Sequence, residues 1–254
     1  MTLGEFFTAL GYVVGALVFW WAARRRRLAT DGIGKVVVTG FVCGILGAKV
    51  TELIAEGWPI RLPWIAALDL ENGGRALLGG VIFGWLGVVL AKHRLGIRRP
   101  TGDLFALALP AGEAIGRVGC YFNQCCYGIK CNLPWAIYQH GALRHPTQIY
   151  SSLTGLGLLL WLLWEARRRG MFGLGARDGP EPEGDLFYLY LLGFGITRFL
   201  IEFVRWRESL FFGLSPMQWF CLDLIVVGAV GLRLVALRRS GTPTAPMLNG
   251  GVRA

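Results

Sequence analysis

Seven apolar stretches, each about as long as a bilayer is thick, set the tightest limit on what this chain can fold into. A helix needs roughly 20 apolar residues to cross the hydrocarbon core. Such stretches occur at residues 4–23, 34–55, 74–92, 103–119, 147–165, 185–204 and 214–237. Hydrophobic residues make up 54% of the chain and charged residues only 17%, whereas a soluble domain carries about a quarter charged residues. The sequence therefore predicts an all-α polytopic membrane protein with about seven transmembrane helices.

The distribution of basic residues predicts the orientation in the membrane. The net charge is +10, and basic runs lie at the ends of apolar stretches, at residues 24–27, 92–99, 167–169 and 238–239. This placement is typical of cytoplasmic loops held by anionic headgroups and argues against nucleic acid as a partner. Because the dense runs follow the first, third, fifth and seventh stretches, we expect the N-terminus outside and the C-terminus in the cytoplasm.

The same pattern organises the chain into parts. Residues 1–240 are expected to form one membrane-embedded domain, and residues 241–254 a flexible cytoplasmic tail. Residues 170–184 combine glycines with charges and are expected to form a cytoplasmic linker. The loop 120–146 is long, contains four cysteines and is extracytoplasmic on this topology. Loops of that length usually carry function or are disordered.

Charged residues inside the apolar stretches mark the candidate site. An arginine at mid-bilayer costs roughly 2.5–3.5 kcal/mol, so it must face inward with a partner. Arg198 and Glu202 are four residues apart, a spacing that stacks them on one helix face. They could form a salt bridge that only locks the helix. Alternatively, the guanidinium could bind an anionic headgroup through two parallel hydrogen bonds while the carboxylate orients it.

A second intramembrane arginine lies in the fourth stretch, which is the weakest of the seven. Pro110, Glu113 and Arg117 interrupt it, and a buried or re-entrant position would tolerate those breaks. Glycines flank Arg117 on both sides, which favours a position that lines a cavity. Asp103, near the start of this stretch, could belong to the site or could simply cap a helix at the interface.

Five motifs in chain order resemble those of the bacterial prolipoprotein diacylglyceryl transferases. They are GG-x4-GG at residues 73–80, GRVGCYFNQCCYG at 116–128, RHPTQIY at 144–150, GFGITRFLIEFVR at 193–205 and GLSPMQW at 213–219. The resemblance extends over roughly residues 5–240. It implies a seven-helix bundle with a periplasmic head, which agrees with the apolar pattern.

The resemblance also implies an activity and a set of site residues. The family transfers a diacylglyceryl group from phosphatidylglycerol to the cysteine thiol of a lipoprotein precursor, at the outer face of the bacterial inner membrane. By the match, Arg117 and Arg198 flank the headgroup phosphate, and Glu202 is the acidic partner of Arg198. The other matched positions expected to bind substrate are Gly79, Gly80, Asn123, Gly128, His145, Gln148, Tyr150 and Phe194. No cofactor is implied.

The chain departs from the family where polar groups would activate the thiol. Leu78 stands where the family has a histidine before the second Gly-Gly pair, and Ser151 where it has glutamate. Cys120 and Cys125 replace an asparagine and a glutamate of the signature loop. Both phosphate-handling arginines are therefore present, whereas much of the thiol-activating set differs.

A general base must consequently come from another position. The candidates are Glu202 and His145, although His145 could instead cap the fifth helix, because Pro146 suits a first helical turn. With this base uncertain, two functions remain open. One is phosphatidylglycerol-dependent transfer to a prolipoprotein cysteine or to a different acceptor. The other is a non-catalytic or redox-active paralogue that binds anionic lipid or a membrane partner.

The cysteines form two groups. Cys43 and Cys221 lie in apolar stretches and are expected in the core, while the loop contains four in the pattern C-x4-CC-x4-C. The loop thiols could form structural disulfides in an oxidising compartment. They could instead take part in the chemistry, and we expect Cys120 or Cys125 to act as a nucleophile or redox gate beside Arg117. A metal site is the third and least favoured alternative, and no metal ion is assigned, because the usual two-residue spacing of zinc cysteines is absent and no histidine lies within the run.

Overall fold

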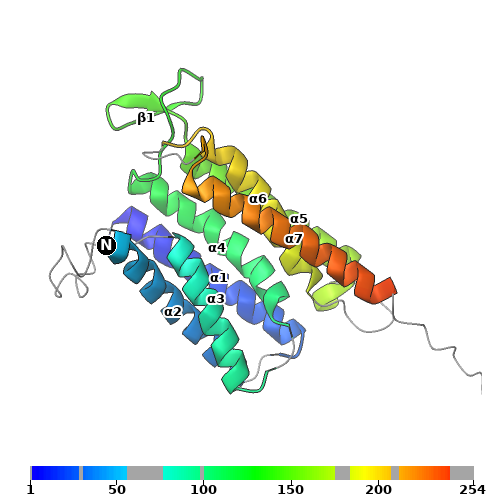
Figure 1. The fold of residues 1–254 in the computed structure, drawn as a ribbon. Helices are drawn as coiled ribbons and strands as arrows, with labels where there is room; N and C mark the ends of the chain where they lie inside the picture. The colour runs from blue at the N-terminus through cyan, green and yellow to red at the C-terminus, as the bar shows by residue number, and fades with distance from the viewer. Residues whose placement is uncertain are drawn as a thin grey trace, which may run out of the picture. The chain divides into compact units, whose positions relative to one another are not determined.

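The computed structural model describes residues 2–28, 31–55, 77–97, 100–174, 184–206 and 212–240. These residues form seven α-helices, one 3-10 turn (η2, Met171–Gly173) and a two-stranded hairpin, so the all-α fold class is confirmed (Figure 1). The α-helices are α1 (Leu3–Arg25), α2 (Asp31–Ala55), α3 (Leu77–Arg94), α4 (Gly102–Phe122), α5 (Thr147–Arg168), α6 (Asp185–Glu202) and α7 (Pro216–Ser240). The predicted tail, residues 241–254, and most of the predicted linker lie outside the described residues.

Four of these helices are long and apolar enough on their own to cross a membrane. They are α1, α2 over Gly32–Thr51, α5, and α7 over Pro216–Arg238. Helices α4 and α6 differ because each contains the acidic and basic residues of the candidate site. Charges of this kind raise the cost of exposure to lipid, so these two helices depend most on packing against their neighbours.

The chain forms two compact units, one of residues 17–101 and one of residues 1–16 with 102–254. In the first unit, α2 and α3 pack antiparallel through glycines that allow close backbone approach. A Cβ at Gly79 would lie 2.6 Å from the carbonyl oxygen of Gly47, and one at Gly80 would lie 3.4 Å from that of Gly44. Gly79 and Gly80, expected to bind substrate, thus lie in the seam between α2 and α3. The side chain of Leu78 lies outside the described residues.

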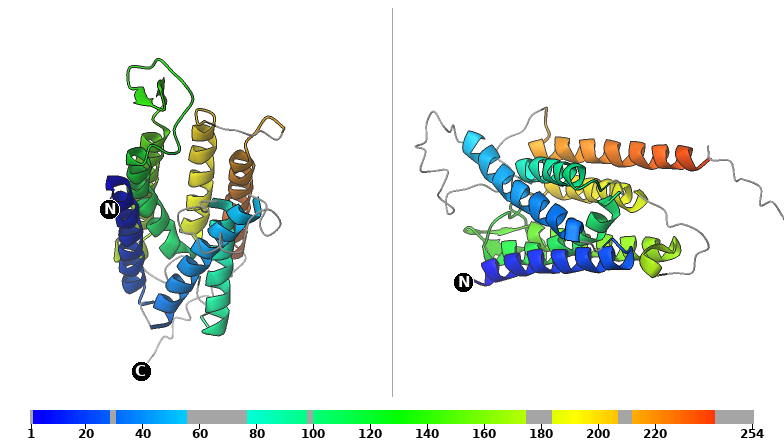
Figure 2. Two further views of the ribbon diagram at one scale, coloured as in Figure 1. Left: turned by 90° about the vertical axis from the view of Figure 1, so that its left-hand side faces the viewer. Right: turned by 90° about the horizontal axis from the view of Figure 1, so that it is seen from below.

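In the second unit, helices α4, α5, α6 and α7 pack against one another, and the first half of α1 lies along α4 (Figures 1 and 2). Strands β1 (Ile137–Gln139) and β2 (Ala142–Arg144) form an antiparallel hairpin in which Tyr138 faces Leu143. The hairpin stands at the end of the unit where α4 ends and α5 begins (Figures 1 and 2).

The opposite end of these helices is pinned by buried carboxylates. Asp103 is completely buried, and its two oxygens accept hydrogen bonds from the backbone nitrogens of Gly184 at 2.7 Å and Phe187 at 3.0 Å. Asp103 therefore acts as a helix cap, one of the two roles considered for it, and the helix that these two hydrogen bonds cap is α6. Beside it, Arg169 joins Asp185 at the start of α6 to Glu165 of α5, with contacts of 2.6 Å to each carboxylate.

Candidate active site

Two arginine–glutamate pairs with the same four-residue spacing form the centre of the site. On α4, Nε and Nη2 of Arg117 each lie 3.2 Å from Oε1 of Glu113, and both side chains are 17% exposed. On α6, Nη2 of Arg198 lies 2.8 Å from Oε2 of Glu202, and these side chains are only 4% and 5% exposed. The predicted Arg198–Glu202 pair is present, and α4 contains a second pair of the same design.

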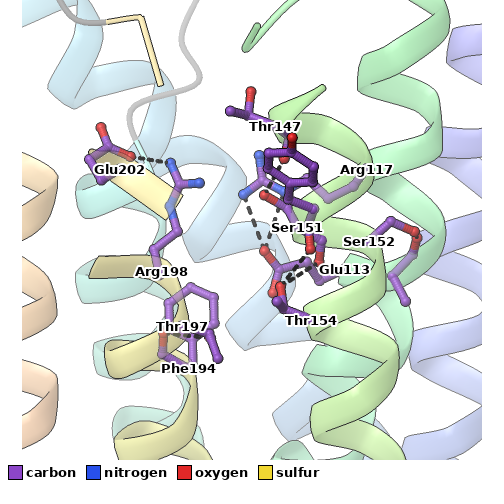
Figure 3. Close-up of polar contacts among 12 residues, drawn as sticks. Glu113, Arg117, Thr147, Ser151, Ser152, Thr154, Phe194, Thr197, Arg198 and Glu202 are labelled. Atoms are coloured by element: carbon purple, nitrogen blue, oxygen red, sulfur yellow. Dashed lines mark hydrogen bonds and ion pairs between the residues drawn. The ribbon is translucent and has the colours of Figure 1, made fainter. Parts of the chain in front are cut away.

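The guanidinium groups of Arg117 and Arg198 point toward one another from α4 and α6, with α5 beside them (Figure 3). The two cations repel each other, and Arg205 adds further positive charge near Arg198. The Nε atom of Arg198 is buried and has no hydrogen-bond partner among the described residues. An unsatisfied buried donor is costly in a protein interior. The arrangement therefore favours an anionic ligand that accepts from Arg198 and neutralises the facing cations.

Glu202 also connects the site to the segments after α6. Arg205 Nη1 lies 3.5 Å from Glu202 Oε2, and the Ser215 hydroxyl donates to Glu202 Oε1 at 3.4 Å. The carboxylate thus contacts two cations and a hydroxyl. A carboxylate that is held in this way orients the guanidinium of Arg198.

The loop between α4 and α5 pairs with the chain that leaves α6. Gly128 forms an antiparallel bridge with Arg205, and the Ile129 nitrogen donates to the Val204 carbonyl at 2.9 Å. A Cβ at Gly128 would lie 2.7 Å from that same carbonyl oxygen, so no larger residue fits. This pairing places the cysteine-containing loop against the end of α6, next to the arginines.

Arg144 of β2 fixes the loop from within. Its guanidinium lies over the rings of Tyr127 and Trp206, at 4.7 and 5.7 Å from the ring centroids, and donates to the carbonyl oxygens of Gln139 and Gly128. The side chain is 8% exposed. These contacts tie Arg144 to the backbone and to two aromatic rings of the loop, which gives it a structural role.

The three predicted substrate-binding residues of the RHPTQIY motif, His145, Gln148 and Tyr150, have defined contacts. The His145 Nδ1 atom lies 3.4 Å from the Tyr150 hydroxyl oxygen, which accepts a hydrogen bond from Trp135 Nε1 at 2.7 Å. Gln148 is buried and donates through Nε2 to the Cys125 carbonyl at 2.7 Å. The alternative that His145 caps α5 is wrong, because Pro146 occupies the cap position and no side chain bonds there.

The two remaining predicted substrate-binding residues, Phe194 and Asn123, have different neighbours. Phe194 stacks on Tyr190, with 5.7 Å between ring centroids, one helical turn before Arg198 (Figure 3). Asn123 lies directly over Gly4 of α1, where even an added Cβ would collide with its amide. Phe194 is thus close to the facing arginines, while Asn123 contacts α1.

The cysteines of the loop divide into a cluster and one separate residue. The Sγ atoms of Cys120, Cys125 and Cys126 all lie within 4.8 Å of one another, and Cys131 lies outside this group. All six cysteines of the chain are among the described residues, and all are free thiols. The structure therefore contains no disulfide staples, and it brings together Cys120 and Cys125, the two thiols expected to take part in the chemistry.

Charge is unevenly distributed within this cluster. Hydrogen bonds from Cys120 and Cys125 lower the pKa of the Cys126 thiol, and the nearby cations Arg205 and Arg117 lower it further. Hydrogen bonds with Cys120 and Cys126 raise the pKa of Cys125, together with burial. If one thiol of the cluster ionises, these contacts favour the Cys126 sulfur, which was not among the predicted site residues.

Sequence reasoning missed four residues that contribute to the site, for different reasons: Glu113, Arg205, Arg144 and Cys126. The four-residue spacing of Glu113 and Arg117 was a sufficient signal, identical to that of Arg198 and Glu202. Arg205 follows in the same motif, one turn beyond Glu202. Arg144 and Cys126 gave no local signal, because their roles depend on the folded loop.

The chain matches the model of the prolipoprotein diacylglyceryl transferase family over residues 5–234. A phosphatidylglycerol–prolipoprotein diacylglyceryl transferase of Gloeobacter violaceus is 34% identical over 250 residues, which cover 93% of this chain and 88% of the relative. One from Methylobacillus flagellatus is 30% identical and covers 94% of both chains, and one from Streptomyces coelicolor is 28% identical and covers 90% of this chain and 68% of the relative. With nearly its whole length matched, the chain belongs to the prolipoprotein diacylglyceryl transferase family.

Proposed function

We propose that this protein transfers a diacylglyceryl group from phosphatidylglycerol to a thiol acceptor, with the donor phosphate held between Arg117 and Arg198. The observation that carries the proposal is the facing pair of guanidinium groups, one of which keeps a buried N–H without a partner. A phosphate offers several acceptor oxygens and a negative charge, which match both features. The names of the relatives point to the same donor and to prolipoprotein as the acceptor.

The geometry suits the charge that develops during the reaction. The reaction breaks the bond between the C3 carbon of the diacylglyceryl group and the phosphate oxygen. Negative charge is left on the departing glycerol phosphate. Two cations that are already in place stabilise that charge without reorganising. Glu202 keeps the Arg198 guanidinium oriented through its 2.8 Å contact, so its role is positioning. The acceptor sulfur must attack as a thiolate.

The proposal places this reaction at the outer face of the bacterial inner membrane. Basic runs after the first, third, fifth and seventh stretches favour a cytoplasmic C-terminus. The arginines and the cysteine-containing loop lie toward the end of the unit where α4 and α6 finish. On that topology, this end faces outward, where a lipoprotein precursor would present its cysteine.

Lysine replacements test the phosphate site. Arg117→Lys and Arg198→Lys keep the charge but lose the planar fork, so each should reduce transfer by about 10²–10³-fold, as for loss of one transition-state donor. Transfer is measured on the purified protein with labelled phosphatidylglycerol and a prolipoprotein peptide. Arg167→Lys, on the exposed face of α5, is the matched control and should retain full activity. Full activity in both site variants would refute a shared phosphate site.

A second candidate function is suggested by the free thiols at Cys120 and Cys125, where the family has asparagine and glutamate. In this second function, the chain is a non-catalytic or redox-active paralogue that binds anionic lipid or a membrane partner. Expression in a strain depleted of its own transferase separates the two functions. Mass spectrometry should find diacylglyceryl-modified lipoproteins if the chain is a transferase and unmodified precursors if it is not.

A further inference from the structure

Three thiols converge at one point beside the site, which is more than a disulfide would need. The Sγ atoms of Cys120, Cys125 and Cys126 all lie within 4.8 Å of one another. A tetrahedral zinc ion with Zn–S bonds of about 2.3 Å places its sulfur ligands about 3.8 Å apart. Small rotations of these side chains therefore suffice to bring all three sulfurs onto one thiophilic cation.

The loop is built to hold this arrangement. Adjacent residues usually direct their side chains apart, but here the backbone is left-handed at Gln124 (φ 50°) and at Cys126 (φ 61°). Left-handed conformations are unfavourable for such residues and persist only where the surroundings impose them. Two buried α5 side chains do so, because Thr147 donates to the Cys126 carbonyl and Gln148 to the Cys125 carbonyl, both at 2.7 Å.

The charges near the cluster suit a metal–thiolate group. Three thiolates and one divalent cation carry a net charge of −1, and Arg117 and Arg205 both interact electrostatically with Cys126. The positive charges of these arginines would offset the net negative charge of the metal–thiolate group, as outer charges do at other metal sites. The usual two-residue cysteine spacing is absent, but that spacing is only one way to bring sulfurs together. Here the end of α4 and the left-handed turns bring them together.

We propose that Cys120, Cys125 and Cys126 bind a zinc-like divalent cation whose fourth position takes the acceptor thiol. Among the described residues, the group contains three ligand side chains and no fourth. Three protein ligands with one open position are typical of catalytic rather than structural zinc sites. A thiol that coordinates such a cation is deprotonated outright, which would replace the histidine that this chain lacks at Leu78.

The role as thiol activator rests on the transferase function proposed above. On coordination, the acceptor thiol loses its proton to water and remains bound as a thiolate. Its sulfur then forms the C–S bond to the glycerol carbon while the C–O bond to phosphate breaks. Glycerol phosphate leaves with the bonding electron pair beside Arg117 and Arg198, and the cation keeps its charge throughout.

Cobalt binding tests the cation site directly. The full-length protein is purified in detergent under reducing, anaerobic conditions, treated with a chelator and titrated with Co²⁺, whose thiolate charge-transfer absorption reports the number of sulfur ligands. We expect one ion per chain with three thiolates, and competition by Zn²⁺. Cys120→Ser, Cys125→Ser and Cys126→Ser should each weaken binding by more than about 100-fold, the upper range for loss of an outer-shell partner. Cys131→Ser, in the same loop but outside the cluster, is the matched control and should bind normally.

Each outcome decides the proposal. The wild-type absorption counts the thiolates by itself, so the test does not depend on whether a serine variant folds. Three outcomes would overturn the site. They are the lack of charge-transfer absorption, cluster variants that bind Co²⁺ as tightly as the wild-type protein, and a disulfide between two of the three cysteines in the isolated protein. A cysteine-containing acceptor peptide should shift the spectrum toward four thiolates, and an unchanged spectrum would overturn the acceptor role. The Arg198→Lys variant should still show this spectral shift with the acceptor peptide while it loses transfer activity. A failure of the phosphate site is therefore distinguished from a failure of the cation site.

Discussion

Arg117 and Arg198 have partners of the same type at the same spacing, yet their surroundings differ. The Glu113–Arg117 pair is partly exposed, whereas Arg198 and Glu202 are almost fully buried. A buried ion pair recovers its desolvation cost only when both partners are present. Removal of one partner therefore has a larger consequence on α6 than on α4.

Replacing each glutamate by glutamine measures this difference. Glu202→Gln leaves the buried Arg198 charge uncompensated and should lower the free energy of unfolding by about 3–5 kcal/mol. Glu113→Gln should lower the free energy of unfolding by less, because the Glu113–Arg117 pair is less deeply buried than Arg198–Glu202. Unfolding of both variants in the same detergent gives the comparison. Equal losses would show that burial does not distinguish the two pairs.

The thiol cluster predicts an unusual order of alkylation with pH. The pKa of Cys126 is lowered, so its reactive thiolate persists as the pH falls below the ordinary thiol range, whereas the pKa of Cys125 is raised and its thiolate forms only at more alkaline pH. In chelator-treated, reduced protein, iodoacetamide should label Cys126 first and should still label it below the ordinary thiol pKa range. Peptide mass spectrometry over a pH series identifies the labelled residue. Earlier labelling of Cys125 would contradict the assignment.

At the scale of elements, the helices approach one another where glycines remove the side chain. A Cβ at Gly228 of α7 would lie 2.9 Å from both the Leu192 nitrogen and the Tyr188 carbonyl oxygen of α6. These are backbone atoms, which cannot move aside without displacing the helix. Gly157 of α5, by contrast, has nothing within 4 Å of its Cβ position. The two glycines therefore serve different purposes in similar helices.

Alanine replacements at these two positions should have opposite effects. Gly228→Ala forces α6 and α7 apart and should destabilise the protein by about 1–3 kcal/mol, the usual cost of overpacking. Gly157→Ala meets open space and should be neutral or stabilise by up to about 1 kcal/mol, because alanine is the better helix former. Thermal unfolding in detergent measures both changes. A Gly228→Ala protein as stable as the parent would contradict the close α6–α7 contact.

For the whole molecule, the sequence predicted the helices and the ion pair that depend on a local pattern. It did not predict contacts between residues far apart in the chain. Hydrophobic length placed the fifth and sixth stretches at 147–165 and 185–204, close to α5 and α6, and periodicity predicted the Arg198–Glu202 pair. The cap that Asp103 places on α6 joins residues 81 positions apart, and no local pattern indicates it. The meeting of Cys126 with Cys120 and Cys125 was missed because it depends on left-handed backbone at Gln124 and Cys126, which are not glycines.

Orientation in the bilayer is a prediction for the whole chain. The basic runs place the N-terminus outside and the C-terminus in the cytoplasm, so a reporter fused after Gly241 should give a cytoplasmic signal. The same reporter inserted at Gly141, in the turn of the hairpin, is the internal comparison and should read periplasmic. A periplasmic signal from the C-terminal fusion would refute this topology.

The local pairing of each intramembrane arginine also bears on how the protein is made. Arg117 leaves the ribosome long before α6 exists, so it cannot wait for a partner on a later helix. Because Glu113 lies one turn away on α4, and Glu202 one turn from Arg198 on α6, each helix brings its own counter-ion. An internally neutralised segment avoids much of the cost of a lone charge in lipid. On the predicted topology, we therefore expect α4 and α6 to leave the translocation channel one at a time, before the bundle that will enclose them is assembled.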